Sequence, residues 1–467
     1  MTPHGVGPMQ SRASLKALLI LAMPLVLSRA TQSVMTFADA LMVEHLGPQA
    51  IAASATGGFN VFLIMILPMG TVFIVQSFVA QLVGAGDRDA TPRFAWYGLI
   101  ISAVAGVISI GLIPAIDPLL LLADFSPGLR EQMSSYMHLR MLSVVAVVGV
   151  ETLGNWYGGL GNTWMALVAS LISMVTDLFL NWVLIYGKLG APAMGVDGAA
   201  LSSTIGSTVG LVFLLVAFWR RWGMAIGGPA PKRAPPNLSF KELRRVIRFG
   251  LPNGLNWFLE FAAFQLFINA VFGALGDNML AAFNVVIAIN SVSFMPAFGL
   301  AQAGAILAGQ AIGARRHGDV WPQVKITLMV ASCWMGLIGA VYLISPTTLL
   351  GLFDSGTSAE FVTIGATMLV ISAAWQLFDA IGITLSETLR AAGDTTWTAM
   401  ARLILAWAVF VPMAFIVVRV WDGGPIGAML CVVGYIALLS GAFAYRFKSG
   451  AWRKIELIEP KLVEPTR

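Results

Sequence analysis

Twelve long apolar runs constrain the fold of this chain more than any other feature of its sequence. Each is long enough for an α-helix to cross the hydrocarbon core of a bilayer, which takes about 20 predominantly apolar residues. Hydrophobic residues make up 58% of the chain and charged residues 11%, whereas soluble domains average roughly 45–50% and 25%. The sequence therefore predicts an all-α polytopic membrane protein. The runs lie at approximately 15–43, 50–82, 92–113, 130–154, 163–187, 197–221, 243–273, 279–312, 320–345, 358–390, 396–420 and 425–446.

The two halves of the chain resemble each other. Q-L-V-G-A at 81–85 matches Q-A-I-G-A at 310–314, an offset of 229 residues, and other short motifs keep a similar offset. Because six helices separate the copies, corresponding segments run in the same direction through the membrane. The pattern predicts two six-helix bundles related by a parallel internal repeat, an arrangement typical of transporters with a site near the membrane midplane.

Lys and Arg concentrate in alternate loops, and Arg402 is counted among the residues of these basic loops. The opposite loops hold only Arg130, Lys188 and Arg419. Basic loops face the cytoplasm, so both termini are expected there, in the plasma (inner) membrane of a bacterium. We expect an N-lobe at 1–222, a cytoplasmic linker rich in Pro, Gly and Lys at 223–240, a C-lobe at 241–447 and a cytoplasmic tail at 448–467.

The charge distribution, the cysteines and histidines, and the motifs of the sequence disfavour several classes of function. The net charge of +5 comes mostly from loops, and aromatic residues alternate with apolar rather than basic ones, so no nucleic-acid partner is expected. The two cysteines are isolated and the four histidines scattered, which predicts neither a disulfide nor a metal centre nor an enzyme. No phosphate-binding loop motif occurs, so ATP-driven transport is not expected and no cofactor is predicted beyond a coupling ion.

Glu260 lies near the middle of the apolar helix predicted at 243–270. A carboxylate at mid-bilayer costs roughly 2.5–3.5 kcal/mol on insertion scales, so an intramembrane acid is a candidate functional residue. Asn253, Asn256 and Trp257 share its helical stripe, which predicts that this side faces protein or a water-filled cavity. The alternative is a neutral, hydrogen-bonded Glu260 that only joins helices.

Three more acids lie inside predicted helices: Asp39, Asp177 and Asp379. The repeat duplicates none of them, so the symmetry of the fold does not require them and we interpret them as functional. For Asp177, one turn before Asn181, a hydrogen bond between packed helices is an equal alternative. Polar or soft side chains on the same helical faces complete the predicted cavity: Gln32 and Met35 beside Asp39, and Gln376 beside Asp379.

Five short motifs follow one another in the order of a known family. They are F-A-D-A-L-M-V-E-H-L-G at 37–47, the Q-x(2)-G-A loop of both halves, D-L-F-L-N-W-V-L-I-Y-G-K at 177–188, the P-x(7)-E spacing from Pro252 to Glu260, and Q-L-F-D-A-I at 376–381 followed by R-A-A-G-D-T. With them, residues 15–447 resemble the multidrug and toxic compound extrusion family, in its NorM-like branch. The resemblance implies an antiporter whose two bundles enclose a cavity that opens alternately to either side.

The resemblance also implies roles for individual residues. Glu260 and Asp379 match acids that bind the coupling cation in the C-lobe, and an N-lobe polar cluster is matched by Asp39, Asp177, Asn181 and Ser203. We expect Glu260 and Asp379 to share one cation, with Na⁺ favoured over H⁺ because a single carboxylate suffices for a proton. Neutral oxygens for that cation are expected from Asn253, Asn256, Asn284 and Gln376.

The sequence thus predicts a monomeric exporter in which inward movement of Na⁺ or H⁺ drives out organic cations or amphipathic drugs. The alternative is a flippase for lipid-linked saccharides, whose cavity needs several basic residues for pyrophosphate. The intramembrane charges here are mainly acidic, which disfavours the flippase. A membrane receptor or scaffold without transport is disfavoured by the repeat together with the unduplicated acids.

Overall fold

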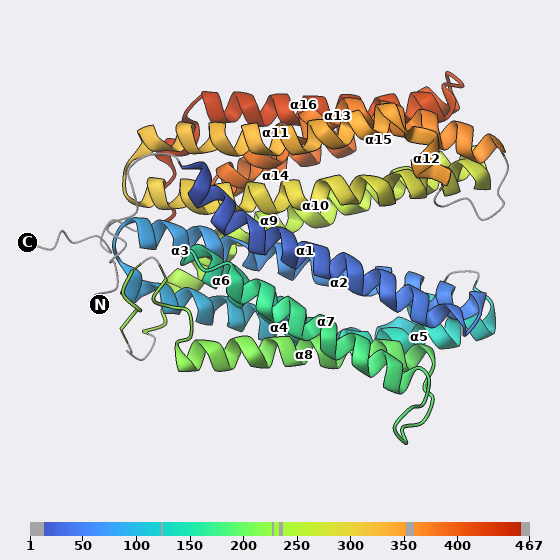
Figure 1. Ribbon diagram of the computed structural model, residues 1–467, viewed down its shortest axis with the longest axis horizontal. Coiled ribbons are helices and arrows are strands. Elements are labelled where there is room, and N and C mark those ends of the chain that lie inside the picture. Colours follow the sequence, from blue (N-terminus) through green and yellow to red (C-terminus); the bar gives the residue numbers. More distant parts are fainter. Residues whose placement is uncertain (1–13, 123–124, 227, 233–236, 352–358, 459–467) are drawn as a thin grey trace, which may run out of the picture. The chain divides into compact units, whose positions relative to one another are not determined.

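The computed structural model describes residues 14–122, 125–226, 228–232, 237–351 and 359–458. Throughout these ranges the regular secondary structure is helical, and no strand occurs in them (Figure 1). In this described part of the chain, eleven spans are long and apolar enough to cross a membrane, and a twelfth is counted when α5 and α6, which meet at a bend of 44°, are taken as one. The prediction of an all-helical, multi-pass protein is confirmed.

The chain divides into two compact units. Within the described residues, unit 1 is Leu27–Gly254, and unit 2 combines residues 14–26 with residues 255–458. Unit 1 holds most of α1 (Leu15–Glu44), then α2 (Pro48–Val72), α3 (Ile74–Gly84), η1 (Arg88–Ala90), α4 (Thr91–Leu120), α5 (Pro127–Met141), α6 (Val144–Gly159), α7 (Trp164–Leu184), α8 (Val196–Arg220) and the start of α9 (Phe240–Phe267).

Unit 2 contains the first turns of α1 and the remainder of α9, and its core is built around α13, which packs against α10, α11 and α16. Two π-helices, η2 and η5, interrupt its α-helices; such widened turns occur frequently at functional sites. Its remaining elements are η2 (Ile268–Phe272), η3 (Gly273–Leu275), α10 (Asp277–Gly313), η4 (His317–Asp319), α11 (Val320–Ile344), α12 (Pro346–Gly351), α13 (Ala359–Ala392), α14 (Thr395–Leu403), η5 (Ile404–Phe410), α15 (Val411–Arg419), α16 (Gly424–Lys448) and η6 (Ala451–Lys454).

The division between the units falls inside helices. The first turns of α1 place Leu18, Leu21 and Leu25 in an apolar cluster with Leu300 and Ile306 of α10, which assigns these turns to unit 2. In the second half of the chain the boundary lies within α9, after the expected linker rather than in it.

The predicted linker is bound to unit 1. Arg88 donates through Nη2 to the carbonyl oxygens of Met224 (3.0 Å) and Ile226 (3.1 Å). Further along, the hydroxyl of Tyr97 accepts a hydrogen bond from the backbone N–H of Ser239 at 2.8 Å. The side chains that hold this segment come from η1 and α4, so its described part has a fixed path along unit 1.

Within unit 1, α2 and the start of α9 cross at unusually short range. A Cβ added to Gly70 would lie 2.7 Å from Cα of Gly254, so neither position has room for a larger residue. Asn253, next to this crossing, donates through Nδ2 to the carbonyl oxygen of Gly70 at 2.7 Å. Small residues that let backbones approach, joined by an interhelical hydrogen bond, are the usual means of packing helices in a membrane.

Candidate functional site

The unit 1 acid cluster consists of Asp39, Asp177, Asn181 and Ser203. The Nδ2 group of Asn181 donates to Oδ1 of Asp39 at 2.6 Å and to Oδ2 of Asp177 at 3.1 Å, using both of its hydrogens. Ser203 hydrogen-bonds to Asp177 from α8. The structure therefore brings together, from α1, α7 and α8, the four residues that the sequence predicts for an N-lobe polar cluster.

Helix geometry explains why these side chains meet. Asp177 and Asn181 are one turn apart on α7, so they share a face, and both are fully buried. The backbone of α8 approaches that face at Gly206, where an added Cβ would lie 2.9 Å from the carbonyl oxygen of Ser173 and 3.1 Å from Cβ of Asp177. A glycine here is thus a requirement for the packing that delivers Ser203 to Asp177.

A positive charge faces this cluster from α5. Arg140 acts electrostatically on both Asp39 and Asp177. Its Nε is buried and has no hydrogen-bond partner among the residues that the structure describes. Arg140 is therefore a positive charge beside two acids.

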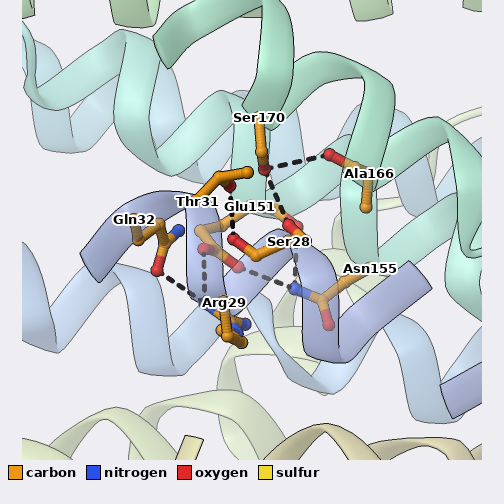
Figure 2. A network of polar contacts seen from close by, with 8 residues as sticks. All are labelled: Ser28, Arg29, Thr31, Gln32, Glu151, Asn155, Ala166 and Ser170. Atoms are coloured by element: carbon orange, nitrogen blue, oxygen red, sulfur yellow. Dashed lines mark hydrogen bonds and ion pairs between the residues drawn. The ribbon is translucent and has the colours of Figure 1, made fainter. Parts of the chain in front are cut away.

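Figure 2 shows a second polar group on α1, ten residues before Asp39 and so about 15 Å along the helix. Nη1 of Arg29 forms an ion pair with Oε1 of Glu151 at 3.2 Å and donates to Oε1 of Gln32 at 3.3 Å. Asn155, one turn after Glu151 on α6, donates to the Glu151 carboxylate at 3.4 Å. Glu151 was not among the predicted site residues, although the spacing from Glu151 to Asn155 inside an apolar run is a detectable signal.

The unit 2 acid cluster consists of Glu260, Asp379 and Arg402. Glu260 of α9 forms an ion pair with Nη1 of Arg402 from α14. Asp379 of α13 lies within the electrostatic reach of both. Its half-buried carboxylate has no hydrogen bond or ion pair with any residue that the structure describes. Glu260 is thus neutralised by the protein itself, and Asp379 is the carboxylate that remains available.

Arg402, which the sequence counts with the basic loops, does not lie in a loop. The residue lies inside the span Thr395–Arg419, directly before the π-helix η5, and its side chain is only 14% exposed. Its guanidinium carbon lies 5.5 Å from the ring centroid of Phe443. An arginine near one end of an apolar run reads as a loop residue, because the sequence does not show that Glu260 is its partner.

Two predicted sources of neutral oxygens have other partners. Gln376 is 1% exposed, donates to Oδ1 of Asn290 at 2.7 Å and accepts from the hydroxyl of Ser293 at 3.1 Å. Asn253 belongs to unit 1, where it bonds to the backbone of α2. The bond of Asn253 uses its nitrogen and not its oxygen, so of these two predicted ligands only Gln376 has its amide oxygen engaged in the bonds described.

The other predicted cavity residues differ in their surroundings. Asn256 is buried, and its Oδ1 has no hydrogen-bond partner within the described ranges, whereas Asn284 is exposed. Trp257 meets Phe298 edge to face, with ring centroids 6.0 Å apart. Met35 is half-buried on α1.

An open cavity of about 460 Å³ lies in unit 1 between the end of α4 and the start of α5. Asp117 accepts a hydrogen bond from Ser134 there, and His138 approaches the same carboxylate at 3.8 Å. Its lining includes none of the predicted site residues, and Asp117 is 62% exposed. It is a shallow surface feature separate from the buried acids.

The family model MatE matches residues 24–183 and 255–416, which cover more than half of the chain and both units. The chain belongs to the MatE family. Among its curated relatives is the probable multidrug resistance protein NorM of Pseudomonas putida, 27% identical over 447 residues, which span 95% of this chain and 96% of that protein. Multidrug resistance protein PmpM of Pseudomonas aeruginosa is 26% identical over 442 residues, 92% of this chain and 90% of the relative.

Solved structures share the fold of this MatE protein. A transporter of the MOP superfamily from Pyrococcus furiosus superposes with a TM-score of 0.85 at 23% identity, covering 97% of this chain and 100% of that one. An outward-facing multidrug resistance MATE family transporter superposes with a TM-score of 0.84 at 23% identity, over 94% and 97% of the two chains. The expectations of this family and of its twelve-helix fold are confirmed, and they favour an exporter over a saccharide flippase.

Proposed function

We propose that the chain is a multidrug efflux transporter that exports monovalent organic cations and related amphipathic drugs in exchange for a coupling cation, Na⁺ or H⁺. The observation that carries the proposal is the unit 1 acid cluster, in which Asp39 and Asp177 share the single amide of Asn181. Two carboxylates held this close repel each other, and a bound cation relieves the repulsion. The names of the curated relatives support drug export.

Competition for the same acids couples the two fluxes. Each of the two acid clusters, in unit 1 and in unit 2, can take either a coupling cation or an organic cation, so binding of one disfavours binding of the other there, and alternating access then exchanges them across the membrane. One-for-one exchange moves no net charge, so its driving force is the concentration gradient of the ion. A tenfold gradient supplies about 1.4 kcal/mol, enough for roughly tenfold accumulation of the drug outside.

The membrane and the orientation are part of the proposal. Names of bacterial relatives and the concentration of Lys and Arg in alternate loops support a plasma (inner) membrane protein with both termini in the cytoplasm. We propose that it acts as a monomer, since each unit holds its own acid cluster.

The test uses the purified protein in liposomes loaded with ethidium, a fluorescent monovalent cation. A sudden Na⁺ gradient and a sudden pH gradient are applied separately, and the release of dye is followed by fluorescence. Dye movement driven by only one of the gradients identifies the coupling ion. If neither gradient moves dye faster than in liposomes without protein, the proposed function is wrong.

A further inference from the structure

The charges of the unit 2 acid cluster do not balance. Arginine stays protonated in proteins, so Arg402 supplies one fixed positive charge against the two carboxylates of Glu260 and Asp379. Glu260 is bonded to Arg402, which leaves Asp379 as the negative charge without a counter-ion. The cluster as a whole therefore carries a net charge of −1 and not −2.

The surroundings of Arg402 hold that charge in place. The ion pair with Glu260 fixes one side of the guanidinium, and the ring of Phe443 lies under it at 5.5 Å, a distance at which an aromatic face attracts a cation. Tyr435 of α16 is 7% exposed, and its hydroxyl has no hydrogen-bond partner among the described residues. An unpaired buried hydroxyl next to these charges is a polar group available to a ligand.

We propose that Arg402 sets the charge number of the substrate: it leaves the unit 2 acid cluster with a net charge of −1, so that the site accepts monovalent organic cations and rejects dications. The inference rests on the proposed function and adds a specificity residue to it. A second positive charge on the ligand would meet the guanidinium of Arg402 at short range, with no further carboxylate to neutralise it. Repulsion of this kind excludes a wrong ligand without any change in the contacts made by the right one.

The charged groups of unit 1 show the same balance. In the unit 1 acid cluster two acids, Asp39 and Asp177, face one arginine, Arg140, while Glu151 is paired separately with Arg29. In both units, with residues at unrelated positions, the acid cluster thus has one positive charge fewer than it has carboxylates. A transporter whose two charge clusters each lack one cation is suited to monovalent partners.

The test compares two dyes with one ring system. Ethidium carries one positive charge, and propidium carries the same phenanthridinium ring with a second charge on its side chain. Initial rates of gradient-driven export are measured in proteoliposomes for both dyes, and the ratio of propidium to ethidium is compared among variants. Wild type is expected to export ethidium and little propidium. Arg402→Gln, which makes the cluster −2, is expected to raise the ratio at least tenfold.

A charge series separates the effect of charge from that of structure. Arg402→Lys keeps the charge and should keep the ratio within about twofold of wild type, given that one charge at short range dominates the discrimination. The double variant Glu260→Gln, Arg402→Gln returns the cluster to −1 and removes both members of the ion pair together, so its ratio should return to the wild-type value. Arg446→Gln removes an arginine that is paired with Asp394 elsewhere in unit 2, and should not change the ratio.

Each outcome decides a different point. An unchanged ratio in Arg402→Gln, or a double variant whose ratio stays as high as that of Arg402→Gln, overturns the inference but leaves the proposed function intact. If Arg402→Gln does not insert, the rate of ethidium export decides. Glu260→Gln, whose cluster is neutral, should export ethidium at least tenfold more slowly than the double variant, whose cluster is −1, and equal rates overturn the inference. Failure of wild type to export ethidium overturns the proposed function instead.

Discussion

Replacing Asn181 by leucine tests whether the unit 1 acid cluster is a working site. The amide of Asn181 contributes a hydrogen bond of 2.6 Å to Asp39 and one of 3.1 Å to Asp177, and it is fully buried. Leucine has a similar size but no donor, so both carboxylates would lose their common partner. We expect normal insertion, a less stable protein and a large loss of ethidium export.

The size of the effect follows from the two bonds. A hydrogen bond to a charged group contributes about 1.5–3 kcal/mol, so the loss of two costs about 3 kcal/mol or more before the apolar leucine offsets part of it. A tenfold decrease in transport rate needs only about 1.4 kcal/mol. If this free energy orders the acids for cation binding, export by Asn181→Leu should therefore fall at least tenfold.

The assay measures initial export rates per inserted molecule, and thermal melting in detergent measures stability. Asn162→Leu is the matched control, because Asn162 is 2% exposed and its side chain donates, among the described residues, to the carbonyl oxygen of Gly223 at 3.0 Å and to no carboxylate. We expect the control to melt at a lower temperature but to export at nearly the wild-type rate. Wild-type export by Asn181→Leu, with a lower melting temperature like that of the control, would show that the amide only joins helices.

Four further predictions address other parts of the chain. Asp39→Asn keeps the size of the side chain but removes its charge, so we expect normal insertion and loss of most export; full export would assign Asp39 to helix packing. Glu151→Gln deprives Arg29 of its carboxylate and should destabilise the protein by about 3–5 kcal/mol, and an unchanged melting temperature would contradict this. Gly206→Val places a branched side chain against the backbone of α7, so the yield of folded protein should fall sharply; a normal yield would show that α8 can shift. Asn237→Cys should react with an impermeant thiol reagent only from the cytoplasmic side, and labelling of intact cells would reverse the predicted orientation.

The part of the site that the sequence predicted best depends on local spacing. Asp177 and Asn181 are four residues apart on one helix, and Asp39 lies on a polar stripe of another, so helical periodicity alone identifies their faces. The family resemblance added Ser203, which no spacing marks. The structure brings all four together, because three helices each present one polar face to the same place.

The part that the sequence missed depends on pairing between distant helices. Arg402 and Glu260 are 142 residues apart, and Arg29 and Glu151 are 122 apart, so no periodic pattern connects either pair. The surroundings of Gln376 depend on helix packing in the same way. Its helical face predicts a cavity residue, but hydrogen bonds to Asn290 and Ser293 use its amide, and such partners are visible only once α10 and α13 are packed.

The units to which the first turns of α1 and α9 belong have a consequence for how this fold could have evolved by duplication. The turns of α1 up to Val26 belong to unit 2, and the turns of α9 up to Gly254 belong to unit 1, positions that differ by nearly the repeat offset of 229 residues. The first turns of each half of the sequence thus belong to the unit formed mainly by the other half, as exchanged segments do in a domain-swapped dimer. A gene encoding one half would be expected to yield a homodimer of intertwined subunits, and the two halves made separately should have to be synthesised together to fold.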